Sequence, residues 1–324
     1  MTDMTARLGH LTLPNPVLTA SGCAGYGREL HQFFDVADLG AVVTKSIQLR
    51  PRSGRATPRM AETPSGMLNS IGLQGPGIDS FIEHDLSWLQ SVGARTAVSI
   101  AGGRVEEYAE LARKLANHPA VSMLEVNISC PNVESRGQVF ACDPTASSHV
   151  ITAVRGVLDE AGDRTPILAK LSPDVTDITE IARACADAGT NGLSLINTLL
   201  GLVIDTDSMA PALGGVTGGL SGPAIRPVAV RCVWQVHRAL PTMPILGMGG
   251  IRSGLDALQF VLAGASAISV GTAVFGDPDA PMRVLGELED ELGARGFSSL
   301  ADAVGFAHLS EDARARRRKK VVNA

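Results

Sequence analysis

Eight short apolar runs recur along the chain, and they limit its possible folds more than any other feature of the sequence. Each run is rich in β-branched residues and is apolar almost throughout, as expected for a strand buried on both faces of a parallel sheet. The runs are 16–20, 41–47, 96–102, 123–129, 166–172, 192–198, 244–250 and 267–273. Helical patterns lie between most of them, at 105–118, 144–162, 177–189 and 255–265. Eight strands alternating with helices predict an α/β fold, the (β/α)8 TIM barrel.

A doubly wound open sheet is the other arrangement that alternates strands with helices. The number of strands favours the barrel, and no GxGxxG fingerprint follows the first run. With 324 residues, 45% of them hydrophobic, the chain can form one large domain, and no shift in composition marks a second. We therefore predict a single domain over 1–324, with a basic tail from about 311. The two longest connections, 48–95 and 199–243, are glycine-rich, and long loops in a compact domain are usually functional.

Charge and cysteine usage exclude several classes of protein. The net charge of −5 produces no basic field, so we expect no nucleic-acid partner. The first residues contain no signal-peptide core and no apolar stretch is long enough to span a bilayer, so we expect no membrane contact. The five cysteines are scattered without a CxxC pair, which argues against a bound metal and against a disulfide framework. This usage indicates a reduced, cytoplasmic protein. The basic segment 314–320 is interpreted as the solvated end of a helix.

Polar side chains cluster where the predicted strands end. Lys45 ends the second strand, Asn127 the fourth and Lys170 the fifth. Asn197 and Thr198 end the sixth. A single asparagine at a strand end is more often a turn former than a ligand-binding residue. The carboxyl ends of barrel strands meet at the face that carries the active site, so two lysines and two asparagines at matching ends predict one shared site there.

Glycine-rich turns follow the seventh and eighth predicted strands, at 249–250 and 271–272. Ser253 then opens the helix after the first of these turns. Backbone N–H groups in such turns and at helix N-termini bind anions, and these loops are the usual phosphate site of a (β/α)8 barrel. The alternative is that the glycines only allow tight turns. The pattern favours a phosphorylated cofactor lying across the barrel mouth.

The segment "NISCPN" (127–132) places a thiol between two carboxamides just after the fourth predicted strand. Cys130 is a candidate nucleophile or general base, because a thiol with a pKa of about 8.5 takes a proton near neutral pH when cations support its thiolate. Cys142 lies in the same connection and is the rival thiol. Cys185 and Cys232 fall on helical patterns and are expected in the core.

Six segments of the chain together resemble one known family. They are "ETPSGMLNSIGLQGPG", "NISCPN", "GQVFACDP", "INTLLG", "TGGLSGPAIRPVA" and "GMGG". The segments are long and occur in the family's order, and they resemble the catalytic subunit of the class 1, B-type dihydroorotate dehydrogenases. The resemblance covers roughly residues 8 to 305.

This resemblance implies a flavoprotein that oxidises (S)-dihydroorotate to orotate in de novo pyrimidine (UMP) biosynthesis, with one FMN per chain. Cys130 matches the base that removes a proton from C5 of the substrate, while a hydride passes from C6 to flavin N5. Lys45 matches a lysine that contacts both substrate and flavin. Lys170 matches a lysine beside the reducible edge of the flavin, where a cation stabilises the reduced ring. These three residues form the predicted catalytic set.

The resemblance also implies which residues hold the two ligands. Those expected to contact FMN are Ala20, Ser21, Lys45, Ser46, Asn127, Lys170, Ile196, Gly222, Gly249, Gly250, Gly271 and Thr272, the last four around the phosphate. Those expected to contact the substrate are Lys45, Asn69, Ser70, Ile71, Gly72, Leu73, Asn127, Asn132, Asn197 and Thr198. Amide side chains suit this task, because each offers a donor and an acceptor to a ring of carbonyl and N–H groups.

Two segments depart from the usual pattern of the family. Ser99 stands where members often have asparagine, so one flavin contact is expected to be shorter or absent. The loop 129–144 resembles the family's active-site lid, which excludes water from the reacting carbon. It ends in "FACDP" where "FGTDP" is commoner, which places Cys142 near the base in sequence. Neither departure removes a predicted catalytic residue.

The B-type resemblance implies a partner protein. In that type a second subunit, which carries FAD and a 2Fe-2S cluster, passes electrons to NAD+. A homodimer of the catalytic chain with two copies of that partner makes a heterotetramer. The present chain has neither a second dinucleotide fingerprint nor cluster-spaced cysteines, so it is not expected to reduce NAD+ alone.

Three alternatives remain open on the sequence. The first is a fumarate-dependent A-type enzyme; quinone-dependent members differ more, because they use serine as base and carry an N-terminal membrane extension. The second is dihydropyrimidine dehydrogenase, although its loop usually reads "SCPH" where this chain has Asn132. The third is a non-catalytic barrel that binds a phosphorylated ligand, which the retained Cys130 and the two lysines disfavour.

Overall fold

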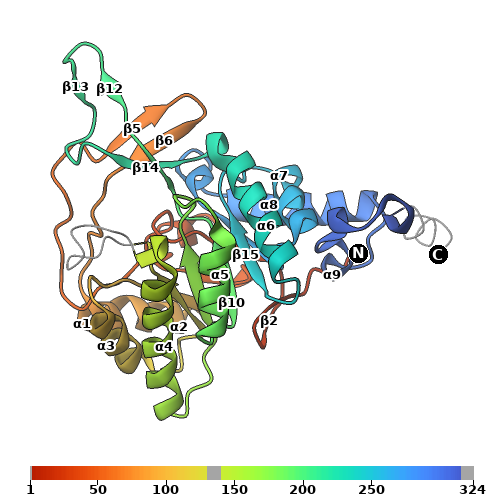
Figure 1. The fold of residues 1–324 in the computed structure, drawn as a ribbon, viewed down its shortest axis with the longest axis horizontal. Coiled ribbons are helices and arrows are strands. Elements are labelled where there is room, and N and C mark those ends of the chain that lie inside the picture. Colours follow the sequence, from red (N-terminus) through yellow and green to blue (C-terminus); the bar gives the residue numbers. More distant parts are fainter. Residues whose placement is uncertain (1, 130–139, 315–324) are drawn as a thin grey trace.

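The computed structural model describes residues 2–129 and 140–314, and its centre is a barrel of parallel strands (Figure 1). The barrel strands are β3 (Val17–Thr19), β4 (Val42–Val43), β7 (Thr96–Ile100), β8 (Met123–Asn127), β9 (Ile167–Leu171), β10 (Gly192–Leu195), β15 (Ile245–Met248) and β16 (Ala267–Val270). They hydrogen-bond in the order β3-β16-β15-β10-β9-β8-β7-β4. A parallel bridge between Leu18 and Ala41 brings β3 beside β4 and nearly closes the circle. Every predicted run contains one of these strands, so the (β/α)8 barrel is confirmed.

Helices follow the strands and cover the outside of the barrel. The longer ones are α3 (Val105–Leu115), α4 (Pro144–Glu160), α5 (Ile178–Asp187), α6 (Arg226–Ala239), α7 (Gly254–Ala263) and α8 (Ala280–Ala294). The shorter ones are η1 (Leu30–Gln32), η2 (Val36–Asp38), α1 (Ile78–Ser80), η3 (Phe81–Leu86), α2 (Ser87–Ser91), η4 (Phe140–Cys142), η5 (Pro223–Ile225), η6 (Thr272–Phe275), α9 (Leu300–Ala303) and η7 (Phe306–His308). The four predicted helical patterns correspond to α3, α4, α5 and α7.

Side-chain caps mark where two of these helices begin. Asp143 accepts a hydrogen bond from the Ala146 N–H at the start of α4, and Ser253 does the same for the Asp256 N–H in α7. Such caps satisfy N–H groups that have no partner within the helix. Cys185 in α5 and Cys232 in α6 are buried, which confirms their predicted place in the core.

The two long connections pair with each other above the barrel. The first contributes β5 (Met60–Thr63) and β6 (Gly66–Asn69), and the second contributes β11 (Leu199–Gly201) and β14 (Gly218–Ser221). These strands form an antiparallel sheet in the order β11-β14-β6-β5. Between β11 and β14, the short hairpin of β12 (Ile204–Asp205) and β13 (Ala210–Pro211) projects away from the barrel (Figure 1). A second hairpin, β1 (Ala6–Leu8) with β2 (Leu11–Leu13), precedes the barrel.

Among the residues that the structure describes, no helix combines the length and the apolar character needed to cross a membrane.

Candidate active site

Two adjoining cavities lie at the carboxyl ends of the barrel strands. The smaller one has a volume of about 400 Å³, within the usual size of a cofactor pocket. The larger one, of about 1570 Å³, extends below the sheet that the two long connections build. The residues that line both are Ser21, Cys23, Lys170, Asn197, Thr198, Ser221 and Thr272. Because these residues form a common boundary, the two cavities make one continuous site.

The structure brings the predicted ligand-binding residues to these two cavities. Along the smaller cavity lie Ala20, Ser21, Lys170, Ile196, Asn197, Thr198, Gly222, Gly249, Gly250, Gly271 and Thr272. Along the larger cavity lie Lys45, Ser46, Asn69, Ser70, Ile71, Gly72, Leu73 and Asn127. Two predicted residues, Cys130 and Asn132, fall outside the described residues. The rest of the predicted set shares one site, and the binding role of each residue stays a prediction.

Three glycines form a bare backbone surface along the smaller cavity. Gly222, Gly249 and Gly250 have φ angles of 90°, 128° and 77°, a region that residues with a Cβ rarely adopt. A Cβ on Gly250 would lie 2.7 Å from the carbonyl oxygen of Gly222, so the two turns are too close for a side chain. The helix α7 starts a few residues later, with Ser253 as its N-cap. Bare backbone beside a helix N-terminus suits an anionic group.

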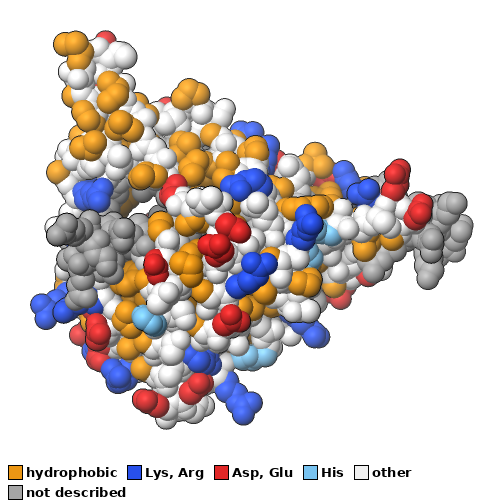
Figure 2. Space-filling model, in the orientation of Figure 1, with side chains coloured by type: hydrophobic (Ala, Val, Ile, Leu, Met, Phe, Trp, Pro, Cys, Tyr) orange, Lys and Arg blue, Asp and Glu red, His pale blue; other side chains and the backbone are white. Residues whose placement is uncertain are grey.

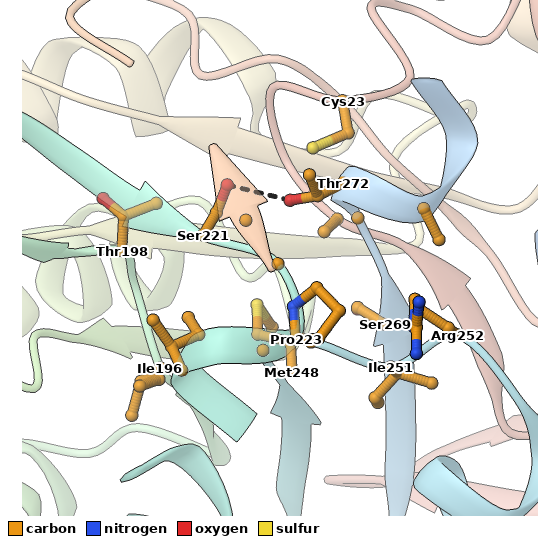
Figure 3. Close-up of a pocket in the computed structure, with 18 of the residues that line it drawn as sticks. Cys23, Ile196, Thr198, Ser221, Pro223, Met248, Ile251, Arg252, Ser269 and Thr272 are labelled. Carbon is orange, nitrogen blue, oxygen red and sulfur yellow. Dashed lines mark hydrogen bonds between the residues drawn. The ribbon is translucent and has the colours of Figure 1, made fainter. Parts of the chain in front are cut away.

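Hydroxyl groups from separate segments also line this cavity. Thr272 Oγ1 donates to Ser221 Oγ at 2.9 Å, which joins the turn after β16 to the end of β14 (Figure 3). Ser269 in β16 is 1% exposed, and its hydroxyl has no hydrogen-bond partner among the described residues. A buried hydroxyl without a partner is unfavourable. Its position on the cavity wall therefore fits a ligand that supplies the missing partner.

A chain of hydrogen bonds fixes the polar side chains at the common boundary. Ser46 Oγ lies 3.3 Å from Ser21 Oγ and 2.9 Å from Ser99 Oγ. The Asn127 amide donates to Ser46 Oγ at 3.1 Å, and its oxygen accepts from the Asn197 amide at 3.3 Å. These bonds set which way the Asn127 amide points. Ser99 is fully buried and lines neither cavity, so its effect on this site passes through Ser46.

Two lysines supply positive charge at the site. Lys45 lines the larger cavity, at the end of the second strand segment. Lys170 is 5% exposed and lines both cavities from β9. Its ammonium group lies 3.5 Å from Glu125 Oε2 and 2.9 Å from Met248 Sδ. The two cations thus lie on a wall that also carries amides and hydroxyls, an arrangement suited to a planar, polar ring.

The family model for dihydroorotate dehydrogenase matches residues 4–292 of the chain. The chain belongs to the dihydroorotate dehydrogenase family. A relative from Pelobacter propionicus is 51% identical over 303 residues, which is 94% of this chain and 98% of the relative. Relatives from Geotalea daltonii and Geobacter sulfurreducens are each 49% identical over 303 residues, covering 94% of this chain and 97% of each relative. All three are named dihydroorotate dehydrogenase B (NAD(+)), catalytic subunit.

Dihydroorotate dehydrogenases are flavin-dependent oxidoreductases, and the residues present at this site fit a flavin. The bare backbone of Gly249 and Gly250 offers room and N–H donors to a phosphate. The unpartnered hydroxyl of Ser269 lies on the same wall. Lys170 and the fixed amide of Asn127 stand at the boundary with the larger cavity, where the reactive part of a flavin would need a cation and polar contacts.

Cys23 is a site thiol to which the sequence analysis gave no role. It follows the first barrel strand and lines both cavities. Burial raises the pKa of its thiol to about 11, against the opposing effect of the nearby Lys170 and Lys45 charges. The group is therefore a neutral thiol at physiological pH and is unsuited to act as a base there.

We expect Cys23 to resist alkylation in the folded protein at pH 7. With a pKa of about 11, its thiolate fraction is roughly 10²-fold below that of an ordinary cysteine, and burial slows the reaction further. Iodoacetamide labelling followed by peptide mass spectrometry measures this directly, with exposed Cys142 as the internal comparison. Equal labelling rates of Cys23 in the folded and the urea-unfolded chain would contradict the expected protection.

Several residues of this site were not named as ligand contacts by the sequence analysis. They are Cys23, Ser65, Gly66, Ser221, Pro223, Ile225, Met248, Ile251, Arg252, Ser269, Ala273 and Gly276. Ser65, Gly66 and Ser221 come from the sheet above the barrel, which the strand pattern did not predict. The sequence did indicate that these three residues could belong to the site, because they lie inside the segments "ETPSG" and "TGGLSGP" that carried the family resemblance.

Proposed function

We propose that this chain oxidises (S)-dihydroorotate to orotate in pyrimidine biosynthesis, with FMN in the smaller cavity and the pyrimidine in the larger one. The observation that carries this proposal is the common boundary of the two cavities. A glycine turn suited to phosphate lies along one cavity, and paired amides lie beside the other, with Lys170 between them. Membership of the dihydroorotate dehydrogenase family supports the same reaction.

FMN would be held by the predicted residues along the smaller cavity. Gly249, Gly250, Gly271 and Thr272 would surround the phosphate, and Ala20, Ser21, Ile196 and Gly222 would contact the rest of the cofactor, with Ser46 reaching it from the larger cavity. FMN, when bound, supplies the acceptor for the hydride that leaves C6 of the substrate. The role of the protein is to hold this acceptor rigidly beside the substrate, because a fixed geometry replaces an unfavourable encounter between two free reactants.

Dihydroorotate would be held by the amides of the larger cavity. Asn69 in β6 donates to the Gly219 carbonyl at 3.2 Å, which ties it to β14 above the barrel. Asn127 and Asn197 bond to each other, and the Asn197 oxygen also accepts from the Thr198 N–H at 2.8 Å. These side chains are fixed before a ligand arrives, so they can discriminate a pyrimidine by its donors and acceptors.

Cys130 would take the C5 proton as the catalytic base. The residue before it, Ser129, lines the larger cavity. The Ser129 N–H donates to Asn127 Oδ1 at 3.2 Å, and its hydroxyl donates to the Lys170 carbonyl at 3.3 Å. The residue that precedes Cys130 in the sequence is thus anchored at the substrate cavity, which supports the proposed role. The C5 proton goes to the cysteine, the C6 hydride leaves with its electron pair, and a C5–C6 double bond forms.

The final electron acceptor would be NAD+, reached through a partner subunit that carries FAD and a 2Fe-2S cluster. The relatives are themselves named catalytic subunits of an NAD(+)-dependent enzyme, which supports a partner for this chain.

We propose a homodimer of this chain with two partner subunits. Exposed apolar side chains support association between copies: Leu200 is 64% exposed, Leu202 50%, Ile204 51% and Met209 84%. Ile204 and Met209 lie in the projecting hairpin, and Leu200 and Leu202 lie just before it. Figure 2 shows hydrophobic side chains gathered over this hairpin, and such patches commonly mark contacts between proteins.

The chain purified alone is expected to be reduced by dihydroorotate and to reduce NAD+ only very slowly. Adding the partner subunit should restore NAD+ reduction, and the chain alone should have the mass of a dimer by light scattering. Efficient NAD+ reduction by the chain alone would contradict the B-type assembly, and fast turnover with fumarate would identify an A-type enzyme. Faster reduction by dihydrouracil than by dihydroorotate would indicate a dihydropyrimidine dehydrogenase, because only dihydroorotate carries a carboxylate.

A further inference from the structure

A carboxylate lies inside the barrel, directly below the proposed flavin site. Glu125 is the central residue of β8 and is 1% exposed. Its Oε2 accepts from the Ser194 hydroxyl at 2.9 Å and lies 3.5 Å from the Lys170 ammonium. Its Oε1 is buried and has no hydrogen-bond partner among the described residues. The rest of β8 up to Asn127 is apolar, so this single charge is an exception within its strand.

The position of Glu125 couples it to Lys170. Alternate residues of a strand share a face, so Glu125 and Asn127 point the same way, into the barrel. Across the adjacent strands, Asn127 pairs with Lys170, and Lys170 pairs with Ser194. Glu125 therefore lies one layer below Lys170 and contacts it from the side away from the solvent. A buried carboxylate with one unpartnered oxygen is unfavourable for folding. The pair that Glu125 makes with the buried Lys170 offsets part of this cost, so the carboxylate belongs with the lysine of the site and not with the apolar strand around it.

We propose that Glu125 is a positioning residue that holds the Lys170 ammonium from below, on the side away from the flavin, and that its own charge lowers the flavin's reduction potential. This inference rests on the proposed function, because it requires FMN in the smaller cavity. Lys170 lines that cavity and favours the electron-rich reduced ring, whereas the Glu125 carboxylate offsets part of this effect. Glu125 and Lys170 are 1% and 5% exposed, and charges buried in this way are screened weakly, so each acts strongly on the cofactor.

The sign of each effect follows from the charges. Glu125→Gln keeps the size and an acceptor oxygen for Ser194 but removes the negative charge, so the flavin potential should rise. Lys170→Met removes the positive charge, so the potential should fall. Glu125→Asp keeps the charge but withdraws it from Lys170 by one methylene, so the potential should rise by less than in Glu125→Gln.

A spectroelectrochemical titration of the FMN-loaded chain, without substrate or partner, measures these shifts. The Lys170→Met variant should have the lowest midpoint potential, followed by the parent chain. Both Glu125 variants should lie above the parent, with Glu125→Gln above Glu125→Asp. A merely structural role would lower the unfolding temperature and leave the potential unchanged. An unchanged or lowered potential in Glu125→Gln would overturn the inference, and so would the same result in Glu125→Asp if the Gln variant does not fold. A parent chain that takes up no FMN would instead overturn the proposed function.

Discussion

Replacing Cys130 by alanine is expected to abolish nearly all turnover of dihydroorotate while the flavin remains bound. A positioned general base contributes typically about 10²–10⁴-fold to a rate, and alanine leaves no group to accept the C5 proton. The residues that line the smaller cavity lie on other segments, so the yellow colour should persist. Steady-state kinetics gives the loss of kcat, and the visible absorbance gives the flavin content per chain.

Cys142→Ala is the matched control for this variant. Cys142 is exposed, and its Sγ donates a hydrogen bond to the Asp174 carbonyl at 3.6 Å. Its pKa is raised by partial burial and by the Asp174 charge, which makes it a poor base at neutral pH. We expect this variant to retain nearly full turnover. A large loss in Cys142→Ala together with an active Cys130→Ala would assign the base to Cys142 instead.

Gly250→Ala is expected to give a folded chain that no longer retains FMN. Gly250 has a φ of 77°, and an alanine Cβ there would lie 2.7 Å from the Gly222 carbonyl oxygen and 3.0 Å from Arg226 Cβ. The left-handed conformation alone costs a residue with a Cβ roughly 1–2 kcal/mol. The turn must therefore shift away from the position that suits the phosphate. Flavin content after purification and the affinity of the apoprotein for added FMN measure the effect.

Gly156→Ala provides the control for a glycine replacement. Gly156 lies within α4, and a Cβ there would meet nothing within 4 Å. Alanine should raise stability slightly, by about 0.4–1 kcal/mol, because it restricts the unfolded chain and favours the helix. FMN should stay bound. If Gly250→Ala retained FMN as tightly as Gly156→Ala does, the glycine turn would not be the phosphate site.

Much of the fold could be predicted because barrel strands are local, continuous apolar segments. All eight were recognised from their local pattern of β-branched, apolar residues, although β4 contains only two residues, Val42 and Val43. The sheet above the barrel could not be recognised this way. Its strands β6 and β14 pair Asn69 with Gly219, which lie far apart in the sequence, and both strands are largely half-buried and contain glycine. Pairing of this kind depends on tertiary contacts that no local pattern records.

The candidate site was predictable where a polar residue ends a predicted strand. Lys45, Asn127 and Lys170 meet this condition, and the topology of the barrel then brings them together. Glu125 was missed because it lies within an apolar run, where one charged residue does not interrupt the strand pattern. Its relation to Lys170 depends on the register of β8 with β9, which the sequence does not record. The charge inside that run was nevertheless a usable signal, because buried carboxylates rarely occur without a role.

The most direct test of the whole account is an anaerobic titration of the purified, FMN-loaded chain with dihydroorotate, followed by the absorbance of the oxidised flavin. We predict stoichiometric bleaching, because the chain's own residues should complete the first half-reaction without any partner. A flavin that stays oxidised under excess dihydroorotate, yet is bleached by dithionite, would contradict the proposed substrate and the arrangement of the two cavities.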